Sequence, residues 1–491
     1  MHGVTLTKRP ADWSVIQQEN GYGQICLEGH FEVHPAAIVV GVESVFPCFR
    51  VMNEYDNMPV IPWTEISDFV LTDSINFRGH FHTEISVPEG GPYRLETTLK
   101  TKSTQPNITW LYRGDCSMHL LIGDVFIIAG QSNSAGHAWD YCPDPPHLCV
   151  HLFRNNGRWD LAAHPMNEST DGGSLPNEEM GIPGISPYLS FGKKYYSLTG
   201  RPVGLVQTAL GGSSISQWNP KDGELYKNML SRIAMTGGKY AGVLWYQGCN
   251  DTIPSKAAYY YENFLELVTS LRRDLGYDIP FFTVQLNRQI DAESDESWGM
   301  VREAQRRAAM EIPGVSLMTT LNLSISDPIH NSAQANLVLG ERLAMQAAGV
   351  LHAAQVLPFN PPMLQRSGLL SENAKNKKAL DPQEIWLDLE FANVKGWFVL
   401  YSSKGSESGF TLEDENGEVK ILTIRANLED KNHVLLRLSR MPLGRCLLSF
   451  GWQADPVKNP VTDAVTYLCP AAFYKNEIRV TAGGTEIGKH D

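Results

Sequence analysis

The chain has 491 residues, of which 42% are hydrophobic and 19% are charged, a composition that predicts a globular protein of two to four domains. Its 41 basic and 54 acidic residues leave a formal net charge of −13 without a dense basic patch. This argues against nucleic acid as a partner, because phosphate binding needs clustered lysine and arginine. No apolar stretch reaches the roughly 18 residues that a membrane span requires, so no membrane association is expected.

The N-terminal segment and the cysteines predict a cytoplasmic protein. Residues 1–13 lack the charged-then-apolar pattern of a secretory signal, although removal of a signal would make the protein a secreted one. The eight cysteines form no CxxC pair, which argues against a structural zinc site. Cys142 and Cys149 are near enough in sequence to bridge a loop, but we expect free thiols.

Residues 1–118 show a sequence pattern typical of short strands and turns. Residues 38–42 and 80–87 are β-branched or alternate between apolar and polar side chains, and residues 89–93 form a strong turn signal. No convincing long helix occurs here. The pattern predicts a β-sandwich domain over residues 1–118.

Residues 119–354 alternate between apolar runs and longer amphipathic stretches. The runs cover residues 125–129, 150–153, 203–207, 242–246, 281–285 and 315–319. Helix-like segments between or after them cover residues 187–198, 259–275, 300–310 and 333–348. This alternation predicts a parallel sheet with helices on both faces, and functional groups should gather beyond the carboxyl ends of its strands.

Two further segments complete the expected organisation. Residues 140–184 are rich in proline, glycine and asparagine, and either wall a substrate cleft or form a surface insertion. After a proline-rich linker at residues 357–363, strand patterns return at residues 385–391, 397–401 and 434–438. A β-rich domain is therefore expected over residues 355–491, with the first β-domain as a candidate packing partner.

The first candidate for catalysis is Ser132, which follows the apolar run at residues 125–129. Gly130 and Gly136 on either side allow a tight strand-to-helix turn. A serine at such a turn projects from the sheet edge, where its own amide can also face a developing oxyanion. The alternative is that Ser132 is only the N-cap of a helix.

His330 and Asp327 form the second candidate group. A serine hydroxyl needs a base, and histidine has a suitable pKa. Asp327, three residues earlier, can fold back to hold the imidazole in one tautomer, and Pro328 stiffens that turn. A surface or packed histidine is the alternative interpretation for His330.

The third group supplies donors for an oxyanion. Gly211 and Gly212 follow the run at residues 203–207, and a glycine lets a backbone N–H approach the substrate closely. Asn250, within the Gly-Cys-Asn-Asp segment at residues 248–251, supplies a side-chain N–H. Ordinary turn residues would show the same pattern.

The order of serine, glycine, asparagine and Asp-x-x-His resembles the SGNH hydrolase superfamily. Residues 121–125, 130–133 and 244–248, together with the Gly211-Gly212 pair and Trp218, are similar to the sialate O-acetylesterase family and to related acetylxylan esterases. Segments 329–344, 450–452, 470–473 and 90–93 extend the resemblance over nearly the whole chain. It implies a central α/β/α, flavodoxin-like SGNH domain over residues 119–354 between two β-rich domains.

The sequence departs from that family at two places. Cys249 stands where an acidic residue is usual after the glycine, which leaves the orientation of His330 to Asp327 or to a backbone carbonyl. We interpret Cys249 as a packed residue rather than a nucleophile. Ser134 replaces a common methionine, which changes the pocket but removes no catalytic group.

These residues together predict serine-dependent acyl transfer that needs neither metal nor cofactor, and the resemblance implies a carbohydrate O-acetylesterase. Gln247 and Trp218 are candidates to line the sugar pocket, although Trp218 and Trp245 are equally suited to the core and we favour the core for Trp245. The resemblance implies acetylated sialic acid as the first candidate substrate, and acetylxylan or another acetylated polysaccharide is the alternative. A non-catalytic carbohydrate-binding relative and a lipase-like or thioester-cleaving relative are the competing classes.

Overall fold

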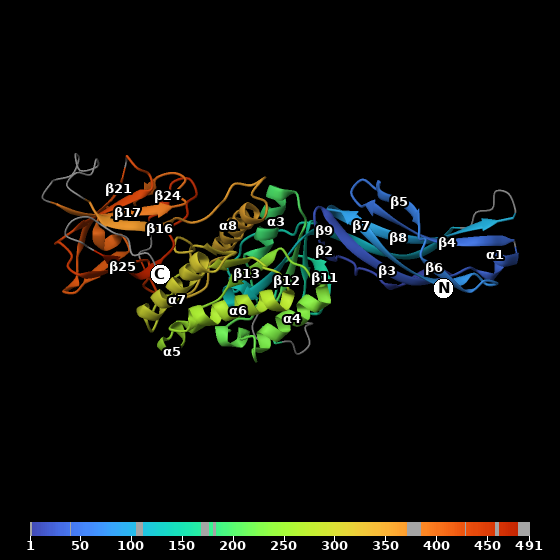
Figure 1. The fold of residues 1–491 in the computed structure, drawn as a ribbon, viewed down its shortest axis with the longest axis horizontal. Helices are drawn as coiled ribbons and strands as arrows, with labels where there is room; N and C mark the ends of the chain where they lie inside the picture. The colour runs from blue at the N-terminus through green and yellow to red at the C-terminus, as the bar shows by residue number, and fades with distance from the viewer. Residues whose placement is uncertain are drawn as a thin grey trace.

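A computed structural model gives the fold, an elongated multidomain arrangement with a central α/β region between two β-rich regions (Figure 1). The two β-rich regions lie at opposite ends of the molecule, so the N-terminal and C-terminal β-regions do not pack against each other. The structure describes residues 2–39, 41–104, 111–167, 176–179, 183–370, 384–427, 429–456 and 461–479.

Two sheets share one apolar core in the N-terminal region. One sheet has the order β1-β3-β7-β6, and β5, β4, β8 and β9 pair in succession in the other, with β2 parallel to β9. Alternation along β3 sends Ile25, Leu27 and Phe31 into the core, which Val51 and Leu95 enter from the opposite sheet. The elements are β1 (Gly3–Lys8), β2 (Val15–Gln17), β3 (Tyr22–Glu32), α1 (Pro35–Val39), β4 (Val42–Asn53), β5 (Pro59–Glu65), β6 (Phe69–Asp73), β7 (Arg78–Pro88), β8 (Gly90–Ser103) and β9 (Leu111–Gly130).

The 20-residue strand β9 joins the N-terminal region to the centre. Its first half pairs with β8, and its second half pairs with β12 and β13. Residue 118, where the sequence places a domain boundary, therefore lies inside a continuous strand. The direction in which β9 enters the central sheet is fixed by backbone pairing on both sides of that point.

The central region extends this sheet to eleven strands and has the order β11-β10-β12-β9-β13-β14-β15. The strands from β10 to β15 along this path run parallel, as predicted. The sheet as a whole is mixed, because β11 is antiparallel to β10 and the pairs β5-β4, β4-β8 and β8-β9 are antiparallel too. All residues of β10, β12, β13 and β14 are buried, as the continuous apolar runs require. The strands are β10 (Val150–Phe153), β11 (Trp159–Leu161), β12 (Val203–Gln207), β13 (Gly242–Tyr246), β14 (Phe281–Val284) and β15 (Val315–Met318).

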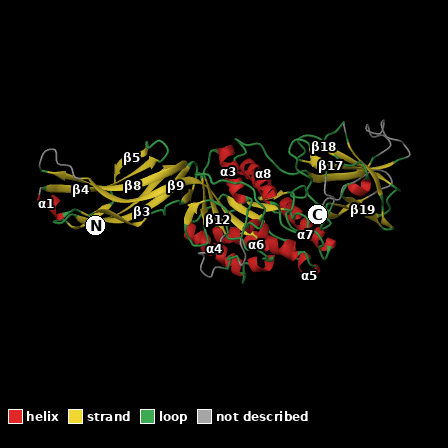
Figure 2. Ribbon diagram, turned by 180° about the vertical axis from the view of Figure 1, so that it is seen from behind, coloured by secondary structure: helices red, strands yellow, loops and turns green. Residues whose placement is uncertain are grey.

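Helices cover both faces of the central strands. In Figures 1 and 2, α3 and α8 lie on one side of the sheet, and α4 and α6 lie on the other, where α7 packs against α6. The helices are α3 (Tyr188–Thr199), α4 (Glu224–Thr236), α6 (Tyr260–Leu275), α7 (Asp295–Glu311) and α8 (Ala333–Leu351). The four helices expected from sequence are confirmed, and α4 is an additional one. None of the helices in the described part of the chain is long and apolar enough to cross a membrane.

The C-terminal region consists of three small antiparallel sheets around a second core. They have the orders β16-β17-β22-β21, β20-β19-β23-β25 and β18-β24. This region packs against α7 of the central region. Its strands are β16 (Met363–Leu369), β17 (Ile385–Ala392), β18 (Phe398–Val399), β19 (Phe410–Asp414), β20 (Gly417–Glu418), β21 (Ile421–Ala426), β22 (His433–Leu438), β23 (Arg445–Phe450), β24 (Thr462–Asp463) and β25 (Phe473–Arg479).

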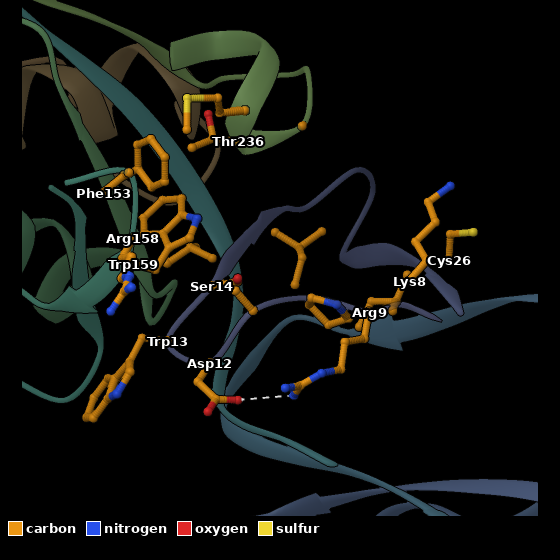
Figure 3. A pocket seen from close by; sticks show the side chains of 18 of the residues that line it. Lys8, Arg9, Asp12, Trp13, Ser14, Cys26, Phe153, Arg158, Trp159 and Thr236 are labelled. Carbon is orange, nitrogen blue, oxygen red and sulfur yellow. Dashed lines mark hydrogen bonds and ion pairs between the residues drawn. The ribbon is translucent and has the colours of Figure 1, made fainter. Parts of the chain in front are cut away.

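A cavity of about 720 Å³ lies where the first strands meet the central region (Figure 3). Lys8, Arg9 and Trp13 line it from the N-terminal side, and Phe153 and Trp159 line it from the central side. Arg9 is paired with Asp12 at 3.5 Å on its wall. Neither Ser132 nor His330 lines this cavity.

The eight cysteines are all unbridged, in agreement with the expectation of free thiols.

Candidate active site

Ser132 lies at the carboxyl end of the central strand β9, as the sequence predicts. Gly130 ends this strand at φ +125°, and a Cβ there would lie 2.3 Å from the carbonyl oxygen of Tyr246. The backbone therefore turns sharply where only glycine fits. Ser132 then opens α2 (Ser132–Ala135), a single turn that ends when the Gly136 amide donates to the Ser132 carbonyl at 2.9 Å. The expected helix is thus only one turn long.

Asp327 folds back onto His330 in the loop between β15 and α8. The Asp327 Oδ2 to His330 Nδ1 distance is 2.6 Å, and Oδ1 accepts the amides of Ile329 and His330 at 2.8 and 2.7 Å. Partial burial raises the pKa of the Asp327 carboxyl, but these two amides and the imidazole outweigh burial and leave the pKa below its usual value. The pair therefore holds an ionised carboxylate against one ring nitrogen and leaves Nε2 for a reaction partner.

The Ser132 turn and the His330 loop lie against each other, although about 200 residues of chain separate them. The Asn133 side-chain oxygen accepts the Asn331 amide at 2.9 Å. Within the described residues no hydrogen bond joins the Ser132 hydroxyl to His330. Such bonds are often long in a site without substrate and shorten when substrate binds.

The oxyanion candidates Gly212 and Asn250 also meet. Asn250, in η2 (Cys249–Asp251) after β13, donates from Nδ2 to the Gly212 carbonyl at 2.7 Å. Gly212 has φ +68°, and a Cβ there would meet nothing within 4 Å, so this turn is open on that side. The Gly211 amide differs because it donates to the Glu179 carboxylate at 2.6 Å. The backbone amide of Gly211 is therefore already hydrogen-bonded to Glu179, whereas Gly212 lies beside the side-chain amide of Asn250.

Two buried side chains hold these loops in place, and the sequence did not single them out. Gln131 Oε1 accepts the amides of Gly248 and Asn250 at 2.9 and 3.3 Å. Asp251 accepts the Ile215 amide at 2.9 Å and the Gln247 side chain at 2.5 Å. Burial raises the pKa of Asp251, and these two donors oppose that rise. The polar network ties the ends of β9, β12 and β13 into one unit.

Gln247 and Trp218, the predicted sugar-binding residues, are fully buried. Gln247 bonds to Asp251 and to the Ser213 carbonyl. Trp218, at the end of η1 (Ile215–Trp218), packs edge-on against Trp245 at 5.2 Å between ring centroids. A substrate cannot reach either side chain in this structure, so they support the loops from below and are not sugar contacts here. Burial of Trp245 agrees with its assignment to the core.

Cys249 and Ser134, the two departures from the family pattern, are also buried. Burial raises the pKa of the Cys249 thiol to about 12, so it stays protonated at neutral pH and is a poor nucleophile. The Ser134 hydroxyl donates to the Ala129 carbonyl at 2.8 Å and contacts the Tyr188 hydroxyl at 2.5 Å. Ser134 therefore fills the space below the turn and does not face a pocket.

Three residues near His330 were missed by the sequence analysis. The His137 ring lies 5.2 Å from the His330 ring, and the exposed Trp139 ring lies 5.8 Å from it. Glu179 bonds to His137 at 3.2 Å while it holds Gly211. His137 and Trp139 are close to Ser132 in sequence, and proximity was their only signal. Glu179 belongs to the long segment 140–184, part of which, residues 168–175 and 180–182, lies outside the described residues.

One group of potential metal ligands occurs among the described residues, away from this site. Cys26, Glu28 and His82 lie on neighbouring strands of the N-terminal sheet, and Lys8 contacts Glu28 at 3.3 Å. The Ser132 and His330 neighbourhood is not part of this group.

Comparison with known proteins supports an esterase. Residues 122–349 match the family described as carbohydrate esterase, sialic acid-specific acetylesterase. A protein named a probable carbohydrate esterase of Arabidopsis thaliana is 28% identical over 244 residues, which are 45% of this chain and 88% of that protein. A solved carbohydrate acetylesterase from Xanthomonas citri is 18% identical, with a TM-score of 0.59 over 94% of this chain and 97% of that one, a likeness of fold.

The matched segment includes the Ser132 turn, the Gly211-Gly212 turn, Asn250 and the Asp327–His330 pair. Members of this family hydrolyse carboxylic esters of carbohydrates. The central region of this chain is therefore similar to the sialic acid-specific acetylesterase family of carbohydrate esterases.

Proposed function

We propose that this protein is a carbohydrate O-acetylesterase that works through a covalent acyl-enzyme on Ser132. One observation carries the proposal. The Asp327–His330 pair, the Ser132 turn and the Gly212–Asn250 contact come from separate loops and gather at the carboxyl end of one sheet. Nucleophile, base and oxyanion donors at such an edge are the requirements of acyl transfer.

In the proposed reaction, the Ser132 oxygen attacks the acetyl carbonyl carbon while His330 Nε2 removes the hydroxyl proton. Asp327 keeps the imidazole in the required tautomer and stabilises its charged form. The tetrahedral intermediate collapses, the ester C–O bond breaks, and His330 gives its proton to the departing sugar oxygen. Water, deprotonated by the same histidine, then releases acetate and regenerates Ser132.

The Ser132 amide, the Gly212 amide and Asn250 Nδ2 would bind the oxyanion. We prefer Gly212 to Gly211 because Glu179 already accepts the Gly211 amide. Asn250 has two side-chain hydrogens and uses one of them on the Gly212 carbonyl, which leaves the second for the substrate.

We also infer a flavodoxin-like core and a β-sandwich at the N-terminus. The order β12-β9-β13-β14-β15 follows the 2-1-3-4-5 pattern of such sheets, with β10 and β11 added at one edge. The two N-terminal sheets enclose a common core, as sandwiches do.

Acetylated sialic acid is the first candidate substrate because the matching family is named for it. Acetylated xylan is the alternative, and activity that rises with acyl length would instead indicate a lipase-like relative. The test measures acetate released from 9-O-acetylated sialic acid and from acetylated xylan, with Ser132→Ala as control.

Release from one substrate that disappears in Ser132→Ala would support both the reaction and the substrate class. Undiminished release by a folded Ser132→Ala protein would overturn the serine mechanism. Binding of both glycans without hydrolysis would favour the carbohydrate-binding relative.

A further inference from the structure

Trp139 is an exposed aromatic residue beside the proposed general base. It is 60% exposed, and its ring lies 5.8 Å from that of His330 at an interplanar angle of 65°. It also lies 5.7 Å from the His137 ring. An exposed aromatic ring next to a reacting group offers a large apolar surface to a bound ligand.

The backbone around Trp139 is fixed on both sides. The Ala138 carbonyl accepts the Ile185 amide at 2.8 Å. The Asp140 carboxylate accepts the Ala333 amide at 2.9 and 3.0 Å, which ties the segment to the start of α8. These contacts fix the backbone on either side of Trp139 before any ligand binds, and preorganisation lowers the entropic cost of binding.

Gly184 provides the space beneath this segment. A Cβ at Gly184 would lie 2.1 Å from the Ala138 carbonyl oxygen and 3.1 Å from Trp139 Cδ1. A side chain there would push the indole away from its position. The ring is thus seated against the backbone at Gly184, while more than half of the side chain is exposed.

We propose that Trp139 is the binding platform for the pyranose ring of the leaving group. The inference rests on the proposed esterase function, since His330 must protonate the sugar oxygen as the ester bond breaks. The carbon that bears this oxygen therefore lies near the imidazole, and the rest of the sugar extends toward the neighbouring indole. A pyranose presents axial C–H groups on its faces, and these pack well on the negative face of an aromatic ring.

The alternative is that Trp139 only positions His330, since the two rings are in contact. The two roles differ in their dependence on the leaving group. A platform favours esters of a pyranose over esters of a leaving group too small to reach the indole. A positioning residue affects both kinds of ester equally.

The experiment compares kcat/KM for two acetylated pyranoses, O-acetyl methyl β-xylopyranoside and O-acetylated sialic acid, with kcat/KM for methyl acetate. In Trp139→Ala the ratio of kcat/KM for the sugar esters to kcat/KM for methyl acetate should fall by about tenfold, mainly because KM for the sugar esters rises. Trp139→Phe should recover most of the ratio. Trp397→Ala, at a position with 61% exposure in the C-terminal region, is the matched control and should keep the wild-type ratio.

A second measurement does not depend on turnover. Calorimetric binding of the same two sugars to Ser132→Ala should weaken about tenfold when Trp139→Ala is added, and should not weaken when Trp397→Ala is added.

An unchanged kinetic ratio, or equal binding with and without the indole, would overturn the platform, as would no binding of either sugar. Failure of the esterase function is seen separately, as wild-type protein that binds a sugar through Trp139 but releases no acetate.

Discussion

Gly130 shows how one residue places the proposed nucleophile. Its positive φ and its contact with the Tyr246 carbonyl leave no room for a side chain, so the chain leaves β9 sharply and Ser132 lies at the strand end. At this scale the sequence was informative, because glycines on both sides of a serine after an apolar run predict such a turn. It was less informative for Trp218 and Gln247, because their residue types suit both a pocket and a core.

The Asp327–His330 pair leads to a graded prediction. His330→Ala removes the proposed base and should lower kcat by about 10⁶-fold. Asp327→Asn should lower it by about 10⁴-fold, since an amide can keep the local turn but presents an N–H to Nδ1. The larger loss is expected for His330 because the imidazole would transfer the proton itself, whereas Asp327 would act only through the imidazole. Single-turnover acetate release, with circular dichroism to verify folding, checks it.

Equal losses in the two variants would mean that the Asp327 carboxylate is as essential as the imidazole itself. A loss below tenfold in Asp327→Asn would mean that another group orients His330.

At the scale of elements, the site is a set of loops that follow neighbouring strands. The Ser132 turn follows β9, Gly211 and Gly212 follow β12, Asn250 follows β13, and the Asp327–His330 loop follows β15. Their convergence was predictable, because the carboxyl ends of parallel strands meet at one edge. The hydrogen bonds of Gln131, Asp251 and Glu179, which set the geometry of these loops, were not predictable from the sequence.

Asn250 tests the oxyanion assignment. Asn250→Ala removes a side-chain N–H next to Gly212 and should lower kcat about 10²- to 10³-fold with little change in KM. The effect is on kcat because the charge that is stabilised exists only in the transition state. Steady-state kinetics measure it, with Asn416→Ala in an exposed turn of the C-terminal region as the control.

A rise in KM with unchanged kcat would instead place Asn250 in substrate binding. Wild-type kinetics in the variant would remove it from the site.

At the scale of the whole molecule, buried polar anchors join the three regions. Asp124 in β9 accepts from Gln17 and Gln18 of the N-terminal region and from Tyr195 and His352 of the central region. Arg302 of α7 donates hydrogen bonds to the backbone carbonyls of Gly451 and Gln453 in the C-terminal region. Both groups are buried and specific in geometry, so they fix how neighbouring regions meet.

Asp124 leads to a prediction about pH. Burial raises its pKa, but the bonds from His352, Tyr195 and Gln18 outweigh burial and hold the pKa below its usual value. The ionised form therefore stabilises the fold above the unfolded pKa of about 3.9, and this contribution is lost as pH falls through the folded pKa. Asp124→Asn should cost about 1–3 kcal/mol of unfolding free energy at pH 7, and the difference should shrink below pH ~4.

Urea unfolding at several pH values measures this difference, with the exposed Asp222→Asn as control. A difference that grows on acidification would contradict the lowered pKa.

Arg302 leads to a prediction about the C-terminal junction. Burial lowers its pKa to about 10, so it stays charged at pH 7, and it donates to the carbonyls of Leu286, Asn287, Gly451 and Gln453. Arg302→Met keeps much of the volume but leaves these acceptors unpaired, and should cost about 3 kcal/mol. Urea unfolding checks this, with Arg307→Met as control.

Arg307 lies on the same helix and makes a surface pair with Glu311 at 3.0 Å, so its replacement should cost about 0.5 kcal/mol or less. Equal effects of the two substitutions would mean that Arg302 does not anchor the junction.

The sequence by itself determined most strands and helices of the central region, though not β11 or α4, and the residues of the proposed catalytic group. Apolar runs and helical periodicity are local, and a parallel sheet brings the strand ends together by its geometry. Only the tertiary structure decided which glycine amide is already occupied and that Trp218 and Gln247 are buried. It alone also placed Trp139 beside His330 and the two β-rich regions at opposite ends. Those features depend on contacts between distant segments, and no local pattern encodes them.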